Sequence, residues 1–138
     1  MSTHDANAST SSQDPPHNGL PPTDLDRFVD HFLSIMCDRS RRQILELLAS
    51  PAEDAPESEH ISPLERRSGD IARMLGLSPG TVSSHLRQLA SAGLVASRRE
   101  GNAIYYRLSN HMLVRAFHDL MVALNQEHEQ RTNASNAT

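Results

Sequence analysis

The fold is decided by GDIARMLGLSPGTVSSHLRQLASAGLVASRREGNAIYYRL, residues 69–108. Its first part has apolar residues at helical spacing and predicts a short helix that ends at Gly76, a common residue after a helix C-terminus. Ser78 followed by Pro79 is the pattern of an N-cap with proline at the first helical position, so a second helix is expected there. Two helices joined by a short glycine-containing turn predict a helix-turn-helix over residues 69–92.

A β-hairpin is expected directly after these helices. Residues 94–99 and 103–108 are typical of strands, and Glu100-Gly101-Asn102 between them has the composition of a tight turn. A hairpin in this place corresponds to the wing of a winged helix-turn-helix, here over residues 94–108. The fold class predicted is therefore mainly α with a small β-hairpin.

The rest of the chain predicts three more helices and three polar segments. Apolar residues at helical spacing indicate helices at about residues 24–37, 39–49 and 110–128. Polar composition predicts a disordered N-terminal tail at 1–22, an extended acidic loop at 50–68 and a disordered C-terminal tail at 130–138. One domain is thus expected over residues 23–129. The first and last helices have wide apolar faces, which suggests that these faces pack against the rest of the core or against a second subunit.

The charge of the chain is unevenly distributed. Its net charge is -4, and every one of its 13 basic residues is arginine. Residues 64–107 nevertheless hold seven arginines against three acidic residues. A basic segment on an acidic protein is typical of a surface that meets phosphates. No glycine-rich cofactor loop, nucleophile–base pair or carboxylate cluster is recognisable, so neither an enzyme nor a cofactor is expected.

The second helix of the pair predicts its own DNA-facing side. Val82, Leu86 and Leu89 are spaced to face the core, which leaves the polar residues between them facing outward. Polar and arginine side chains on such a helix bind base edges and phosphates in a major groove. The expected DNA-binding residues are Ser78, Thr81, Ser83, Ser84, His85, Arg87 and Gln88 on the helix, with Arg98, Arg99 and Asn102 on the wing.

Residues 38–108 resemble the ArsR family of bacterial winged-helix repressors. The resemblance is carried by DRSRRQILELL (38–48), GDIARMLGLS (69–78), TVSSHLRQL (81–89), AGLV (92–95), RREGN (98–102) and YYRL (105–108). It implies a homodimer built from the first and last helices, which binds an imperfect palindrome as a repressor and is released by an effector. The extended loop 50–68 is longer and more acidic than is usual in the family.

The resemblance does not extend to the metal sites of the family. Residues 64–74 contain no cysteine, so the thiolate site of the family is absent. The positions that match its other site, on the last helix, are Asn110, Met112, Ala123 and Gln126, which are poor zinc ligands. No metal is therefore expected, and His111 and His118, seven residues apart on one helix face, are weak candidates for a different site. Whether the protein binds an unknown small effector stays open.

Cys37 is the single cysteine of the chain. We expect Cys37 to be either a buried, inert residue or a reactive thiol. A reactive thiol at this position could also form a disulfide between two subunits. A winged-helix module for protein contacts and a thiol-responsive regulator that uses Cys37 are the alternative functions. The sequence shows no signal peptide and no membrane span, so a cytoplasmic protein without membrane contact is expected.

Overall fold

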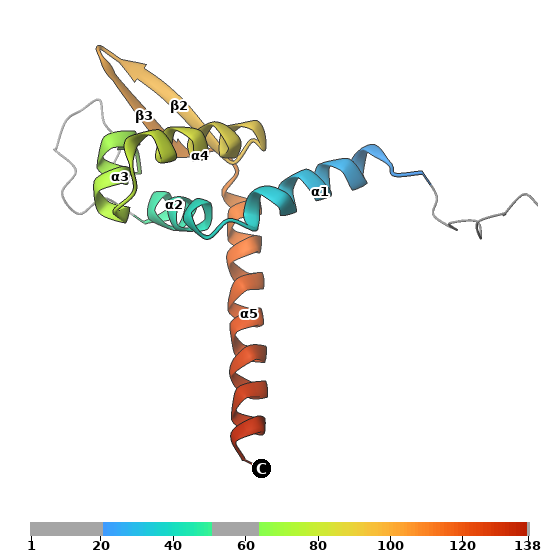
Figure 1. The fold of residues 1–138 in the computed structure, drawn as a ribbon. Helices are drawn as coiled ribbons and strands as arrows, with labels where there is room; N and C mark the ends of the chain where they lie inside the picture. Colours follow the sequence, from blue (N-terminus) through green and yellow to red (C-terminus); the bar gives the residue numbers. More distant parts are fainter. Residues whose placement is uncertain (1–20, 51–63, 138) are drawn as a thin grey trace, which may run out of the picture.

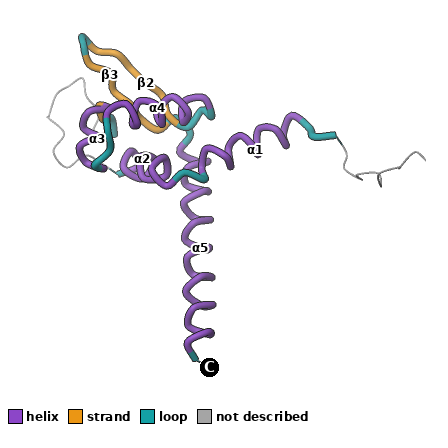
Figure 2. The backbone as a smooth tube through the Cα atoms, in the orientation of Figure 1, coloured by secondary structure: helices purple, strands orange, loops and turns teal. Residues whose placement is uncertain are grey.

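The computed structural model describes residues 21–50 and 64–137. Its elements are, in chain order, α1 (Asp24–Met36), α2 (Arg39–Ala49), β1 (Arg66–Arg67), α3 (Ser68–Leu75), α4 (Pro79–Ser91), β2 (Val95–Glu100), β3 (Ala103–Leu108) and α5 (His111–Asn136). Helices α2, α3 and α4 form a body from which the β2–β3 hairpin, α1 and α5 project in different directions (Figures 1 and 2). The described part of the chain is the winged helix-turn-helix that the sequence predicted, mainly helical with a small antiparallel sheet.

Four helices begin at side chains that cap them, and one of these is the cap that the sequence predicted at Ser78. The N-caps are Thr23, Asp38, Ser78 and Asn110, and each side chain accepts a hydrogen bond from a backbone amide of the first turn. Such a bond satisfies an amide that has no partner within the helix, and it typically stabilises the fold by about 1 kcal/mol. At α1 the bond is reciprocal, and the amide of Thr23 holds the pKa of Asp26 below its usual value.

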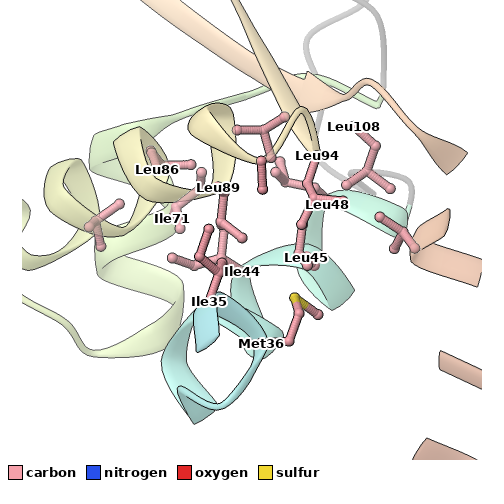
Figure 3. Packing of buried hydrophobic residues seen from close by; sticks show 14 of the residues in the cluster. Ile35, Met36, Ile44, Leu45, Leu48, Ile71, Leu86, Leu89, Leu94 and Leu108 are labelled. Atoms are coloured by element: carbon pink, nitrogen blue, oxygen red, sulfur yellow. The ribbon is translucent and has the colours of Figure 1, made fainter. Parts of the chain in front are cut away.

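The core lies where α2, α3 and α4 meet the base of the hairpin (Figure 3). Val82, Leu86 and Leu89 are at most 1% exposed, which confirms the inward face predicted for α4. Burying such side chains stabilises the fold by about 1.5–3 kcal/mol each. Their buried partners are Ile35, Met36, Ile44, Leu45, Leu48, Ile71, Ala72, Ala92, Leu94, Val95, Leu108 and Val114.

The sheet has one strand more than the sequence predicted. Its order is β1-β3-β2 with antiparallel pairing, and Arg66 lies opposite Tyr106. The sequence predicts a loop at residues 66–68, whereas Arg66 and Arg67 form β1 and Ser68 already begins α3. Two residues are too few to show the alternating pattern of a strand. Whether they form one depends on pairing with β3 and not on their own sequence. The tail predicted for residues 1–20 and the loop predicted for residues 51–63 lie outside the described residues.

Helix α5 is longer than the sequence predicted. The expected disordered tail began at residue 130, but the helix continues to Asn136. No proline or glycine interrupts the sequence from 111 to 136, so nothing local ends the helix. Side-chain pairs one turn apart also support its end, with Arg131 bonded to Glu127 at 2.7 Å.

Helix α1 exposes much of its apolar face. Leu25 is 69% exposed, Phe28 49%, Val29 41% and Leu33 46%. Its contacts lie toward its C-terminal end, where the rings of Phe32 and of Phe117 in α5 meet edge to face with their centres 5.9 Å apart. In Figure 1 the start of α1 stands clear of the body.

Helix α5 likewise exposes apolar side chains, namely those of Met112, Leu120, Val122 and Leu124. None of the described helices is long and apolar enough to cross a lipid bilayer.

Candidate nucleic-acid interface

The turn between α3 and α4 has the geometry of a helix-turn-helix. Gly76 adopts a left-handed conformation with φ +66°, which is favourable for glycine and allows the chain to leave α3 sharply. Two residues later Ser78 accepts a hydrogen bond from the amide of Thr81, and the two hydroxyls lie 2.7 Å apart. Ser78 and Thr81 are both exposed, so the start of α4 is open to solvent.

The solvent-exposed side of α4 carries several polar side chains. Thr81, Ser83 and Arg87 are exposed, and Ser84 is half-buried beside them. Among the described residues no ion pair involves Arg87. This row therefore combines hydroxyl groups with an arginine whose charge has no carboxylate partner in the described structure. Such groups can donate to phosphates and to base edges.

Other polar side chains of α4 contact residues of α1, of α2 and of the corner between them. His85, Gln88 and Ser91 are three residues apart along the helix, and each contacts one of these residues. The three contacts, called the α4 seam below, are His85–Asp38, Gln88–Arg41 and Ser91–His31. The side chains of His85 and Asp38 approach to 3.8 Å, and those of Ser91 and His31 to 3.4 Å. The seam therefore links α4 to α1 and α2 through side chains.

The structure turns His85 inward, although the sequence analysis placed it on the DNA-facing side. Its side chain is 14% exposed, and its Nδ1 atom is buried without a hydrogen-bond partner in the described structure. The facing carboxylate of Asp38 accepts a hydrogen bond from the amide of Arg41, and this bond holds the pKa of Asp38 below its usual value. The sequence could not reveal that His85 turns inward, because Asp38, which it faces, lies 47 positions earlier in the chain (85 minus 38).

The two neighbouring arginines of the wing have different environments. Arg98 donates to Glu65 at 2.7 Å and to Glu100, and its guanidinium lies 5.2 Å from the centre of the Tyr105 ring. These hydrogen bonds raise the pKa of Arg98 above its usual value. Successive residues of a strand point to opposite faces, so Arg99 points away from this cluster. Arg99 is exposed, and the described residues offer it no ion pair.

Arg98 and Arg99 were both expected to bind DNA through the wing, but their environments differ in the structure. The charge of Arg98 is already balanced by two carboxylates, whereas that of Arg99 is available to a ligand. Asn102 is exposed at the turn of the hairpin, next to Gly101 with φ +59°. The sequence did not predict that Glu65 takes part in the wing by pairing with Arg98. The only indication in the sequence is that Glu65 is one of three acidic residues in the basic segment 64–107.

The other candidate residues lie apart from this interface. His111 and His118 are both exposed on α5, where they line a groove between α2 and α5. No group of three or more histidine, cysteine or acidic side chains among the described residues is arranged to hold a metal ion. Cys37 is exposed at the end of α1, so the prediction of a buried cysteine is wrong. It follows the last turn of α1, which leaves its side chain at a corner and not in the core.

These features define a class of protein: a winged helix-turn-helix with a polar, arginine-bearing second helix. A sequence model of the family described as "Bacterial regulatory protein, arsR family" matches residues 62–97. A homodimeric winged helix-turn-helix DNA-binding domain from Mycobacterium bovis, a possible ArsR-family transcriptional regulator, is 31% identical. The match covers 77% of this chain and 86% of that one, with a TM-score of 0.61. The chain belongs to the ArsR family of bacterial transcriptional regulators, which is not a family of enzymes.

Two regulators of Mycobacterium tuberculosis are also similar to this chain. The HTH-type transcriptional regulator Rv0324 is 38% identical over 77 residues, 56% of this chain. The HTH-type transcriptional regulator KmtR is 32% identical over 89 residues, 64% of this chain. The matched parts span 28% and 58% of the length of these relatives, respectively.

Proposed function

We propose that this protein is a sequence-specific DNA-binding regulator that represses transcription by occupying a palindromic operator as a homodimer. The observation that carries the proposal is the exposed row Thr81, Ser83 and Arg87 on α4, next to a wing that presents Arg99. Helix α4 would enter the major groove, and the wing would follow the phosphate backbone. Ser78 and Ser84 on α4, and Asn102 at the turn of the wing, would add polar groups to this interface. The proposal places the protein in the cytoplasm, together with the DNA that it binds.

The exposed apolar faces of α1 and α5 support the homodimer. Phe28 and Leu25 on α1, with Leu120 and Leu124 on α5, would cost free energy in water and are suited to a second copy of the chain. The relative from Mycobacterium bovis is described as a homodimer. A two-fold dimer would present two copies of α4 to half-sites about 10 base pairs apart, which is why the operator is expected to be palindromic.

Arg87→Ala tests the DNA-facing row. The protein and its variants are titrated into DNA from upstream of its own gene, and binding is followed by gel shift. Arg87→Ala should weaken binding, because it removes a cation that the described residues do not neutralise. Arg131→Ala is the matched control, because it removes an exposed arginine near the far end of α5. Equal effects of the two substitutions, or no effect of Arg87→Ala, would contradict the assignment of α4.

Phe28→Glu tests the dimer. Light scattering should show a dimer for the wild type at micromolar concentration and a monomer for the variant, because a carboxylate in an apolar interface is strongly unfavourable. The monomer should also bind the operator more weakly, since it engages one half-site at a time. A dimeric Phe28→Glu protein would mean that α1 is not part of the interface.

Regulation by a thiol is the second candidate, favoured by the exposure of Cys37. Cys37 directly precedes Asp38, which belongs to the α4 seam, so a change at this thiol would act next to the contacts that hold α4. Gel shifts under oxidant and reductant, with Cys37→Ser as control, test this candidate. Adding metal salts to the same series tests for an effector at His111 and His118. An oxidant effect that persists in Cys37→Ser would exclude the thiol mechanism.

A further inference from the structure

The side chain of Arg41 joins the end of α1 to the DNA-facing helix. Its Nε atom donates to the carbonyl of Ile35 at 2.6 Å, and Nη2 donates to the carbonyl of Ser34 at 3.3 Å. The remaining nitrogen, Nη1, donates to Oε1 of Gln88 on α4. Bonds to three acceptors hold the guanidinium in one orientation, so the group that it presents to Gln88 is fixed.

The chemistry of Arg41 determines which way the amide of Gln88 points. A guanidinium has five N–H donors and no acceptor, so the atom of Gln88 that faces it must be the oxygen. The amide nitrogen of Gln88 is therefore directed away from Arg41. Among the described residues this nitrogen donates no hydrogen bond, although the oxygen is bonded. Gln88 is exposed, and it follows Arg87 of the polar row.

We propose that Gln88 meets DNA only as a hydrogen-bond donor and that Arg41 is the positioning residue that makes it so. The inference rests on the function proposed above. A freely rotating glutamine can bond adenine with both its oxygen and its nitrogen. Gln88 instead turns its NH₂ group outward, and this group suits an acceptor: N7 or O6 of guanine, O4 of thymine, N7 of adenine or a phosphate oxygen.

Three substitutions separate the two parts of this arrangement. Gln88→Glu keeps an oxygen for Arg41 but replaces the outward donor by an acceptor. Gln88→Met removes both polar atoms at similar length. Arg41→Lys keeps the positive charge but cannot serve three acceptors in a fixed plane, so the amide of Gln88 becomes free to turn. Ala90→Glu, an exposed position on the same helix, controls for the added negative charge of Gln88→Glu.

The experiment measures affinity and base preference together. An operator is selected from random-sequence duplexes with the wild-type protein, and each base pair is then substituted singly. All variants are titrated against this set and against an unrelated duplex, and thermal unfolding checks that they are folded. A base contact predicts that Gln88→Glu and Gln88→Met lose preference at one base pair by about tenfold. Arg41→Lys should broaden the preference at that same pair, whereas Ala90→Glu should lower affinity on all duplexes without changing preference.

The possible results are distinguishable. If Gln88→Met binds every duplex more weakly by the same factor, the acceptor is a phosphate and the donor role stands. If Gln88→Met and Arg41→Lys are folded and match the wild type in both affinity and preference, the contact is purely structural and the inference is overturned. Tighter or more selective binding by Gln88→Glu would also overturn it. If the wild type selects no sequence at all, the proposed function itself fails and the inference fails with it.

Discussion

Replacing Arg99 and Arg98 separately by alanine should have different effects on DNA binding. Arg99 is exposed on one face of β2 without an ion pair in the described structure, and in the proposed complex it neutralises a phosphate. Arg98 on the opposite face is held by Glu65 and Glu100, so it contributes to the shape of the wing and little to its available charge. Arg99→Ala should therefore change the salt dependence of binding, and Arg98→Ala should not.

The size of the effect follows from the number of phosphate contacts. Each contact contributes about 0.9 to the slope of log K against log salt concentration, and a dimer has two wings, so Arg99→Ala should lower the slope by about 1.8. When the salt concentration falls from about 200 mM to about 50 mM, this difference in slope makes the ratio of wild-type to Arg99→Ala affinity grow about tenfold. Arg98→Ala should leave the slope near the wild-type value, even where loosening of the hairpin lowers the affinity.

Fluorescence anisotropy of a labelled operator at a series of salt concentrations measures both slopes. The wild type, the two variants and Arg131→Ala are compared on the same duplex. The reasoning is refuted if Arg99→Ala retains the wild-type slope, or if Arg98→Ala lowers the slope by as much as Arg99→Ala does. Either result would mean that the ion pairs of Arg98 do not decide which side of the wing faces DNA.

Three further predictions concern stability and structure. Leu86→Ala should lower the free energy of unfolding by about 2–5 kcal/mol in denaturant titrations, whereas its exposed neighbour Arg87→Ala should change it by less than about 0.5 kcal/mol; similar values for the two would contradict the packing of α4. The pKa of Asp38 is lowered, so the stability due to its ionised form is present above the ordinary value of 3.8 and is lost as the pH falls through the lower value in the folded protein. Asp38→Asn keeps a capping oxygen but does not titrate. In urea titrations, the difference in free energy of unfolding between the wild type and Asp38→Asn should therefore shrink below pH 3.8. A difference that stays constant with pH would refute stabilisation by the ionised carboxylate. Residues 130–136 should have helical Cα chemical shifts in NMR spectra, and random-coil shifts would restore the disordered tail that the sequence predicted.

Features that depend on neighbours in the sequence could be predicted. The caps at Asp38 and Ser78 and the buried row of Val82, Leu86 and Leu89 follow from local hydrogen bonding and from the 3.6-residue period of a helix. These features also determine the helix-turn-helix and its outward row, so that much of the candidate site was readable from the sequence.

Features that depend on distant partners could not be predicted. Whether His85 faces solvent or the core depends on Asp38, and the charge available on Arg98 depends on Glu65. Hydrophobic periodicity identifies the apolar side of α4, but it does not distinguish between the two polar sides that remain. The contacts of His85 with Asp38 and of Gln88 with Arg41 therefore emerged only from the tertiary structure.

The length of α5 has a practical consequence for measuring this protein. Its 26 residues, at about 1.5 Å each, make a helix about 39 Å long. Figure 1 shows the C-terminus at the far end of this helix from the β2–β3 hairpin. A fluorophore or a fused reporter at the C-terminus would thus stand well away from bound DNA. Such a label could report on assembly and on tumbling of the whole particle without obstructing the proposed DNA-binding surface.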